Sequence, residues 1–196
     1  MFRAVTILSD WIASVERFVV RAIVLALPLM ILANATGRAL RSPIYWMDEL
    51  AVLTMVWLAM IGMSLTLKTR DAVSVTMLMD AVPPGAMKAM KVLVDLLVLV
   101  FGIVLLVLSY LWFDPLTLMR LGFDLREFSG ETFNFMYQDT TATLGVSKFW
   151  FWLVVPLAAF TTSVHALSNL LQTLATPVAG FVPAAATELA GEGAAP

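Results

Sequence analysis

Four long apolar stretches dominate this sequence and leave few folds open to it. They cover residues 18–36, 48–67, 92–113 and 149–174, and polar segments separate them. A helix that crosses a bilayer needs about 20 mostly apolar residues, because the hydrocarbon core is roughly 30 Å thick. Lipid offers no partner for an unpaired backbone N–H or C=O, so each stretch is expected to be helical. The sequence therefore predicts an all-α membrane protein with four transmembrane helices.

The composition supports this class and removes several kinds of chemistry. Hydrophobic residues make up 61% of the chain and charged residues only 13%, against about 45–50% and 25% in soluble domains. The net charge of −2 gives no basic excess for binding nucleic acid. The chain has no cysteine and one histidine, His165, so it lacks the ligands for a thiolate metal site or a bis-histidine haem. We expect no catalytic residue, cofactor or metal, and no enzyme activity.

Both ends of the chain differ from the apolar stretches. Residues 1–17 predict an amphipathic helix that lies in the membrane interface, since apolar residues recur there at helical spacing. The apolar face consists of Val5, Leu8, Ile12, Val15 and Val19. A cleaved signal peptide is a rival interpretation, because Ala33-Asn34-Ala35 resembles a cleavage site. Residues 175–196 are rich in alanine, proline and glycine and are expected to be disordered.

Charge and aromatic residues predict the orientation of the spans. Seven lysines and arginines fall on the side of the two termini and five on the opposite side, which favours cytoplasmic termini. The loop of residues 114–148 carries five acidic residues, as expected of a translocated segment. Three aromatic pairs fall at this same interface, where such side chains prefer to lie. They are Tyr45 with Trp46, Tyr110 with Trp112, and Trp150 with Trp152.

Ionisable groups inside a membrane are the default candidates for function, and here they are few. Arg21 lies near the start of the first span, and Asp95 follows Lys91 by one helical turn, a spacing that predicts an ion pair. His165 belongs to a polar stripe in the fourth span and has no recognisable carboxylate partner. The predicted spans contain no carboxylate at mid-depth and no pair of broken helices, so we expect the chain to transport nothing alone.

The second span carries two distinct helical faces. One face holds a deep tryptophan and a first-turn glutamate, which predict packing against another subunit. Its residues are Trp46, Glu49, Leu53, Trp57 and Met60. The other face holds Val52, Met55, Ala59 and Gly62, small enough in part for close helix approach. Asp48 is expected to cap its own helix or to pair with Arg38 or Arg41 within the chain.

These residues carry a resemblance to a known family. Tyr45 to Glu49 (YWMDE), followed by Met55 to Leu58 (MVWL) and Gly62, resembles the signature of the small membrane subunit of tripartite ATP-independent periplasmic (TRAP) transporters, the DctQ-like family. The resemblance covers roughly residues 15–172. The chain departs from it at Ala72, where members often have histidine, at Thr76, where an acidic residue is common, and in its longer loop 114–148.

The resemblance implies a role in secondary active transport across a bacterial inner membrane. In such a system the small subunit is a scaffold for a large membrane subunit, which carries the substrate and sodium sites and moves as an elevator. A periplasmic binding protein delivers the substrate, commonly a carboxylate or another organic acid anion, in a transient contact. Two alternatives stay open at this point: a small four-span membrane enzyme, and a homo-oligomeric channel lined by the polar stripe of the fourth span.

Overall fold

A computed structural model describes residues 2–70 and 82–178. These residues form helices and one isolated bridge between Thr140 and Ser147. In chain order the helices are α1 (Phe2–Ala39), α2 (Tyr45–Thr69), α4 (Pro84–Phe113), α5 (Pro115–Arg120), α6 (Leu125–Thr132), α7 (Phe149–Trp152) and α8 (Val154–Ala175).

The predicted fold class is confirmed in its main feature. Four helical segments of the described chain are long and apolar enough to cross a membrane. They are Arg3–Ala39, Tyr45–Thr69, Pro84–Arg120 and Phe149–Ala175. The predicted disordered tail lies largely outside the described residues, as do Ala72 and Thr76.

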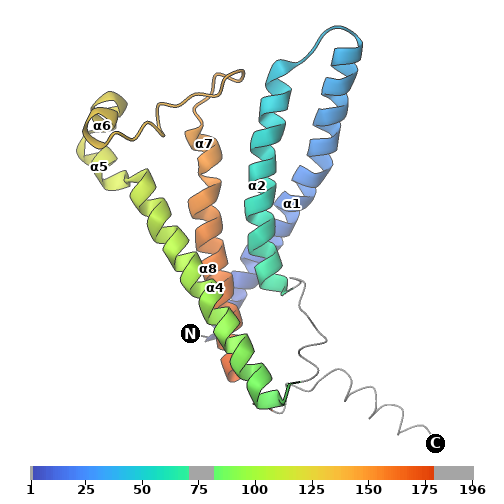
Figure 1. Ribbon diagram of the computed structural model, residues 1–196, viewed down its shortest axis with the longest axis vertical. Coiled ribbons are helices and arrows are strands. Elements are labelled where there is room, and N and C mark those ends of the chain that lie inside the picture. Colours follow the sequence, from blue (N-terminus) through green and yellow to red (C-terminus); the bar gives the residue numbers. More distant parts are fainter. Residues whose placement is uncertain (1, 71–81, 179–196) are drawn as a thin grey trace, which may run out of the picture.

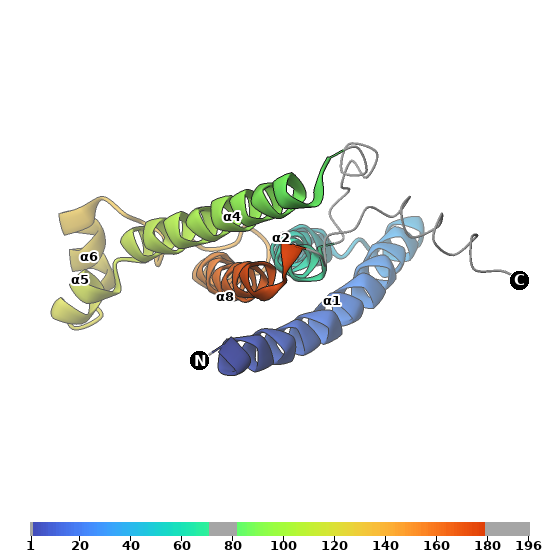
Figure 2. The same cartoon turned by 90° about the horizontal axis from the view of Figure 1, so that it is seen from below.

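The first helix differs from the expected division into an interfacial piece and a span. It is a single helix of 38 residues, about 57 Å long at 1.5 Å per residue. No glycine or proline precedes Pro28, so nothing in the sequence interrupts the helix near residue 17. Figure 2 shows that α1 curves gently along its length. Residues 1–17 are therefore continuous with the first span, and their role as an interfacial segment stays a prediction.

The four long helices are arranged around α8. Seen along the bundle, α2 and α8 lie between α4 on one side and α1 on the other (Figure 2). The long helices come together near the end of α8 and splay apart at the opposite end (Figure 1). The span that contains α8 is by far the most buried of the four. Its polar stripe is therefore covered by neighbouring helices and does not line an open pore within one copy of the chain.

Proline shapes the start of the fourth span. Helix α7 ends at Trp152 and α8 begins at Val154, with one residue between them. Pro156 has no N–H to donate to the carbonyl of Trp152, so the ladder of helical hydrogen bonds is interrupted at this point. The predicted fourth span of 149–174 thus contains a short helix followed by a long one.

The loop predicted at residues 114–148 contains two further helices. Asp114 ends α4 in the left-handed conformation (φ 38°), and its carboxylate accepts a hydrogen bond from the Thr117 N–H at the start of α5. Asp124 caps α6 in the same way, and the N–H groups of Glu127 and Arg126 lower the pKa of this carboxyl. We call residues 115–135 the α5–α6 hairpin; it projects from the end of α4 (Figure 1).

Candidate functional site

The centre of the bundle contains a histidine with a partner on each ring nitrogen. His165 of α8 lies 2.8 Å from the Ser9 hydroxyl through Nδ1 and 3.1 Å from the Glu16 carboxylate through Nε2. Both partners belong to α1. A neutral imidazole with its proton on Nε2 satisfies all three groups, because Nε2–H donates to Glu16 while Nδ1 accepts from Ser9. The three side chains therefore join α1 to α8.

No sequence pattern indicates Glu16 as the partner of His165. The sequence predicts that residues 1–17, which include Glu16, form an interfacial helix. Glu16 lies within the continuous helix α1 and is buried, with 6% of its surface exposed. Ser9 and His165 are fully buried. Since no substrate reaches the Ser9 hydroxyl, the arrangement is a structural contact between helices and not an exposed nucleophile with a base.

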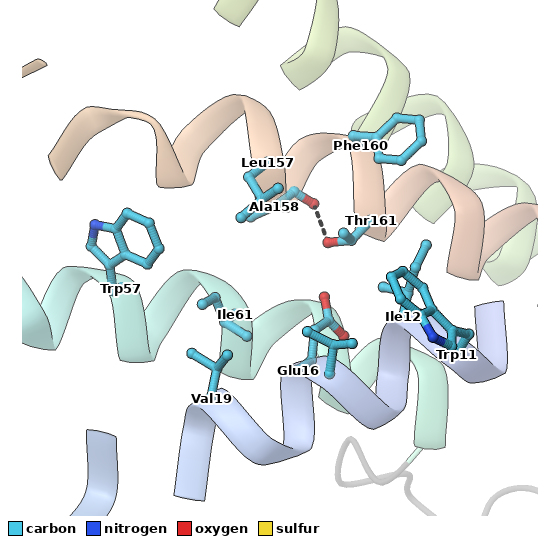
Figure 3. A pocket seen from close by; sticks show the side chains of 11 residues that line it. Trp11, Ile12, Glu16, Val19, Trp57, Ile61, Leu157, Ala158, Phe160 and Thr161 are labelled. Atoms are coloured by element: carbon cyan, nitrogen blue, oxygen red, sulfur yellow. Dashed lines mark hydrogen bonds between the residues drawn. The ribbon is translucent and has the colours of Figure 1, made fainter. Parts of the chain in front are cut away.

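A cavity of about 260 Å³ lies beside this contact, between α1, α2 and α8. Figure 3 shows its lining: Trp11, Val19, Trp57, Ile61, Leu157 and Phe160 surround it. The two polar residues of the wall, Glu16 and Thr161, have partners elsewhere. Glu16 contacts His165, and Thr161 donates to the Ala158 carbonyl and lies 2.8 Å from the Ser64 hydroxyl of α2. The cavity is therefore apolar and offers no site for an organic anion.

A second polar cluster joins the ends of three helices. The Arg70 guanidinium, just after α2, donates to Asp95 of α4 at 2.8 Å, to the Asn169 carbonyl of α8 at 2.9 Å and to the Thr173 hydroxyl at 2.7 Å. The sequence pattern named only Lys91 as a partner of Asp95 and missed Arg70, which lies 25 residues away along the chain. Nearby, Lys68 of α2 pairs with Asp10 of α1 at 2.8 Å.

Two residues of the α2 face predicted for a second subunit have hydrogen-bond partners within the chain. The Trp57 indole donates to the Phe151 carbonyl of α7 at 2.9 Å. The Glu49 carboxylate accepts three backbone N–H groups, from Ala142, Thr143 and Leu144, at 2.7–3.2 Å, as well as the Thr143 hydroxyl. Leu53 and Met60 are half-buried on this face, and Trp46 is exposed.

The polar atoms of Glu49 and Trp57 thus have partners within the chain, and the predicted contact of this face with another subunit stays a prediction. For Glu49, the physical reason for the contact within the chain lies in the backbone. Three successive N–H groups of the loop converge on one carboxylate, which gives Glu49 a more complete set of donors than one basic side chain would. Glu49 holds the loop of residues 142–144 against the start of α2.

The remaining predicted residues lie at the turn between α1 and α2. Asp48 accepts hydrogen bonds from the Asn34 amide and from Arg38, with which it forms an ion pair. The side-chain oxygen of Asn34 accepts the N–H of Ile44 at 3.2 Å. Arg41 is exposed and adopts a left-handed backbone conformation (φ 59°). Asp48 therefore holds the turn together, while α2 begins without a side-chain cap at Ile44.

The outward face of α2 is the one with small residues. Val52, Met55 and Ala59 are exposed, and the space around Gly62 is open, since a Cβ placed there would meet no atom within 4 Å. No helix of the described chain covers this face. Within the same residues, no group of three or more histidines, cysteines, aspartates or glutamates could hold a metal ion.

A comparison with known protein families identifies the family of this chain. The profile of tripartite ATP-independent periplasmic transporters, DctQ component, matches residues 27–176. The chain belongs to the DctQ family. It is thus the small membrane component of a TRAP transporter, and members of this family function with DctM and DctP components. A comparison with individually curated proteins gave no match. The matched region contains the whole of α2, α4 and α8, so the family assignment covers the core of the bundle.

Proposed function

We propose that this DctQ-family chain is the fixed scaffold of a TRAP complex in a bacterial inner membrane. It pairs with a large subunit for sodium-driven uptake of organic acid anions delivered by a periplasmic binding protein. The observation that supports the scaffold role is that the buried polar side chains of this chain bond to one another and to its backbone. Across residues 2–70 and 82–178, buried side-chain polar atoms bond to other parts of the chain, with Thr162 Oγ1 the one exception. Several of them fasten one helix to another, and apart from the Thr162 hydroxyl no buried side-chain polar atom of these residues is left to bind a transported anion.

The outward face of α2 is the best candidate for the contact with the large subunit. Helices in lipid gain no hydrophobic energy by associating, so they rely on close packing at small residues. Ala59 and Gly62 supply such residues on an uncovered face. The exposed residues of α4, by contrast, are large and apolar along most of its length, as expected of a surface in contact with lipid.

The scaffold proposal is tested by co-purification and uptake. The tagged chain should co-purify a large polytopic subunit from its native membrane, and deleting the chain should abolish uptake of the organic acid. Gly62→Leu should reduce both the yield of complex and the rate of uptake, because the added side chain separates the two helices. Val100→Leu is the matched control, since it adds aliphatic volume at an exposed position of α4.

Two outcomes would contradict different parts of the proposal. Uptake that persists without the chain would overturn the scaffold role itself. A Gly62→Leu variant with normal complex yield and normal uptake would leave the scaffold role intact and show that the large subunit packs elsewhere.

We further propose that both termini are cytoplasmic and that the α5–α6 hairpin is periplasmic. Four spans place the two ends of the chain on one side, and aromatic rings gather at the opposite end of the bundle. There the Trp112 and Trp152 ring centroids lie 5.6 Å apart, and those of Tyr137 and Phe149 lie 5.1 Å apart. Such clusters favour a membrane interface.

This orientation predicts the activity of two reporter fusions. Alkaline phosphatase, which is active only outside the cytoplasm, should be active when fused after Gly130 and inactive when fused after Thr176. Expression levels of the two fusions, measured by immunoblot, provide the control. Activity only in the fusion after Thr176 would mean that the chain has the opposite orientation.

A further inference from the structure

The α5–α6 hairpin carries apolar side chains that the rest of the described chain leaves uncovered. Phe133 exposes 83% of its surface and Phe123 65%. Soluble surfaces rarely display several large apolar side chains on one short segment unless these side chains bind something. The exposed set consists of Leu116, Met119, Phe123, Leu125, Phe133 and Phe135.

These side chains are not part of the core that holds the hairpin together. That core is formed by Leu118, Phe128 and Met136, which are buried. The Phe128 ring meets the ring of Tyr137 edge to face, with centroids 5.3 Å apart. On the outside, Arg120 of α5 pairs with Glu131 of α6. The hairpin thus has buried apolar residues and a separate set of exposed apolar residues, which we call its outer apolar surface.

The backbone at two of the exposed residues supports a role for this outer surface. Phe123 (φ 64°) and Phe133 (φ 55°) both adopt the left-handed conformation. A bulky side chain is unfavourable there, and glycine or asparagine commonly occupies such positions at helix ends. Two aromatic residues therefore occupy positions whose backbone conformation is unfavourable for a bulky side chain. Exposure of their rings to water would add a second unfavourable contribution. An environment that receives the rings offsets both costs.

The position of the hairpin identifies that environment. It begins directly after α4, and the Asn134 amide donates to the Trp112 carbonyl at 2.6 Å while the Tyr137 hydroxyl donates to that of Phe113. Exposed Tyr110 and Trp112 mark this level of α4 as a membrane interface. The hairpin extends from the end of α4 away from α1 and α2 (Figures 1 and 2). Its outer surface continues the exposed apolar surface of α4.

The charges on the segment favour one kind of lipid contact. Residues 114–135 contain four acidic and two basic side chains, so the segment is net negative. Electrostatic attraction to anionic headgroups would require the opposite sign. Binding must therefore come from insertion of apolar side chains at the boundary of headgroups and acyl chains.

We propose that the α5–α6 hairpin is an interfacial membrane anchor whose outer apolar surface enters the leaflet at the end of α4. By holding Trp112 and Phe113 at a constant depth, the hairpin fixes the level of α4 in the bilayer. This inference is independent of the scaffold role and holds for either orientation of the chain. A protein surface that covers the same residues is the competing occupant, and the experiment distinguishes the two.

The absence of cysteine from the chain allows a direct test. Phe123→Cys and Phe133→Cys, each in the full chain, are labelled with an environment-sensitive fluorophore and reconstituted in phosphatidylcholine nanodiscs. Gly130→Cys is the control, because it lies on the side of α6 that also carries Glu127 and Glu131. Leu116→Cys and Met119→Cys, one turn apart on α5, replace the first pair if either phenylalanine variant does not fold.

We expect lipid-borne doxyl groups near the headgroup to quench labels at 123 and 133 several-fold more than at 130, and aqueous iodide to show the reverse order. Labels as accessible to iodide as the one at 130 would overturn the proposal, since the surface would then face water. Labels shielded from both quenchers would also overturn it, because they would be buried against protein.

Discussion

Replacing either Glu16 or His165 alone by leucine should destabilise the chain strongly. Glu16→Leu leaves the Nε2 atom of a fully buried histidine without a partner, and His165→Leu leaves a buried carboxylate without its donor. Removing the carboxylate leaves a buried neutral N–H unpaired, which costs about 1–3 kcal/mol. Removing the histidine leaves a buried charge unpaired, which costs about 3–5 kcal/mol. The free energy of unfolding, measured by reversible denaturation in mixed micelles, should fall by these amounts in the respective single variants.

The double variant Glu16→Leu, His165→Leu provides the decisive comparison. It leaves no unpaired charge, so it should be clearly more stable than the sum of the two single effects predicts. Leucine at both Arg120 and Glu131, an exposed pair, serves as the control and should show a coupling of only about 0–1 kcal/mol. Equal, additive and small losses at 16 and 165 would show that water reaches both groups and that they do not join the helices.

The sequence did not reveal the partner of His165, because the rule that apolar residues are buried and polar residues exposed does not hold for a helix in lipid. The apolar face of residues 1–17, which includes Leu8 and Val15, predicts an interfacial helix and assigns no partner to Ser9 or Glu16. The structure exposes the two apolar residues and buries the two polar ones. Lipid solvates an apolar face as well as a protein core does, so the polar face is the one that gains from burial against another polar face. Glu16 and His165 are also 149 residues apart, and no local spacing joins them.

For α2, the sequence indicates which residues share a helical face but not which face packs against the rest of the chain. Spacings of three and four residues correctly separated the helix into a face with Trp57 and a face with Gly62. Which face the chain covers depends on atoms that no side-chain pattern reveals: the Phe151 carbonyl and the N–H groups of residues 142–144. As expected, the deep Trp57 indole has a hydrogen-bond partner. It is the Phe151 carbonyl, which lies at an irregular helix start near Pro156 in the same chain.

Hydropathy predicted the four spans because their apolar composition determines both helicity and depth. It did not predict where the helices end, since termini depend on local bonds. The third span was expected to begin at residue 92, but α4 begins at Pro84, with Pro83 as its N-cap residue. The α5–α6 hairpin was interpreted as a loop because its helices are too short for a periodic signal. The N-cap residues Asp114 and Asp124 are the features that could have indicated it.

Gly102 allows α4 to approach α8 closely at Ser163, and Gly102→Leu should loosen the packing of these two helices. A Cβ at residue 102 would lie 2.7 Å from the Ser163 hydroxyl and 3.3 Å from the backbone N and Cα of Ser163. The Ser163 hydroxyl also donates a hydrogen bond to the Ala159 carbonyl at 2.7 Å. A leucine would therefore press against the α8 backbone. Overpacking of this kind costs about 1–3 kcal/mol and sometimes more, which should appear as a lower free energy of unfolding in micelles.

Gly62→Leu is the matched control for this prediction because it makes the same change in another span. Nothing lies within 4 Å of a Cβ at residue 62, so leucine there meets no clash and gains helix propensity of up to about 1 kcal/mol over glycine. In the isolated chain the two variants should therefore change stability in opposite directions. If Gly102→Leu were as stable as Gly62→Leu, α4 and α8 would not be in close contact at Ser163, and the support for α4 would have to come from the Arg70–Asp95 cluster and the loop beyond Phe113.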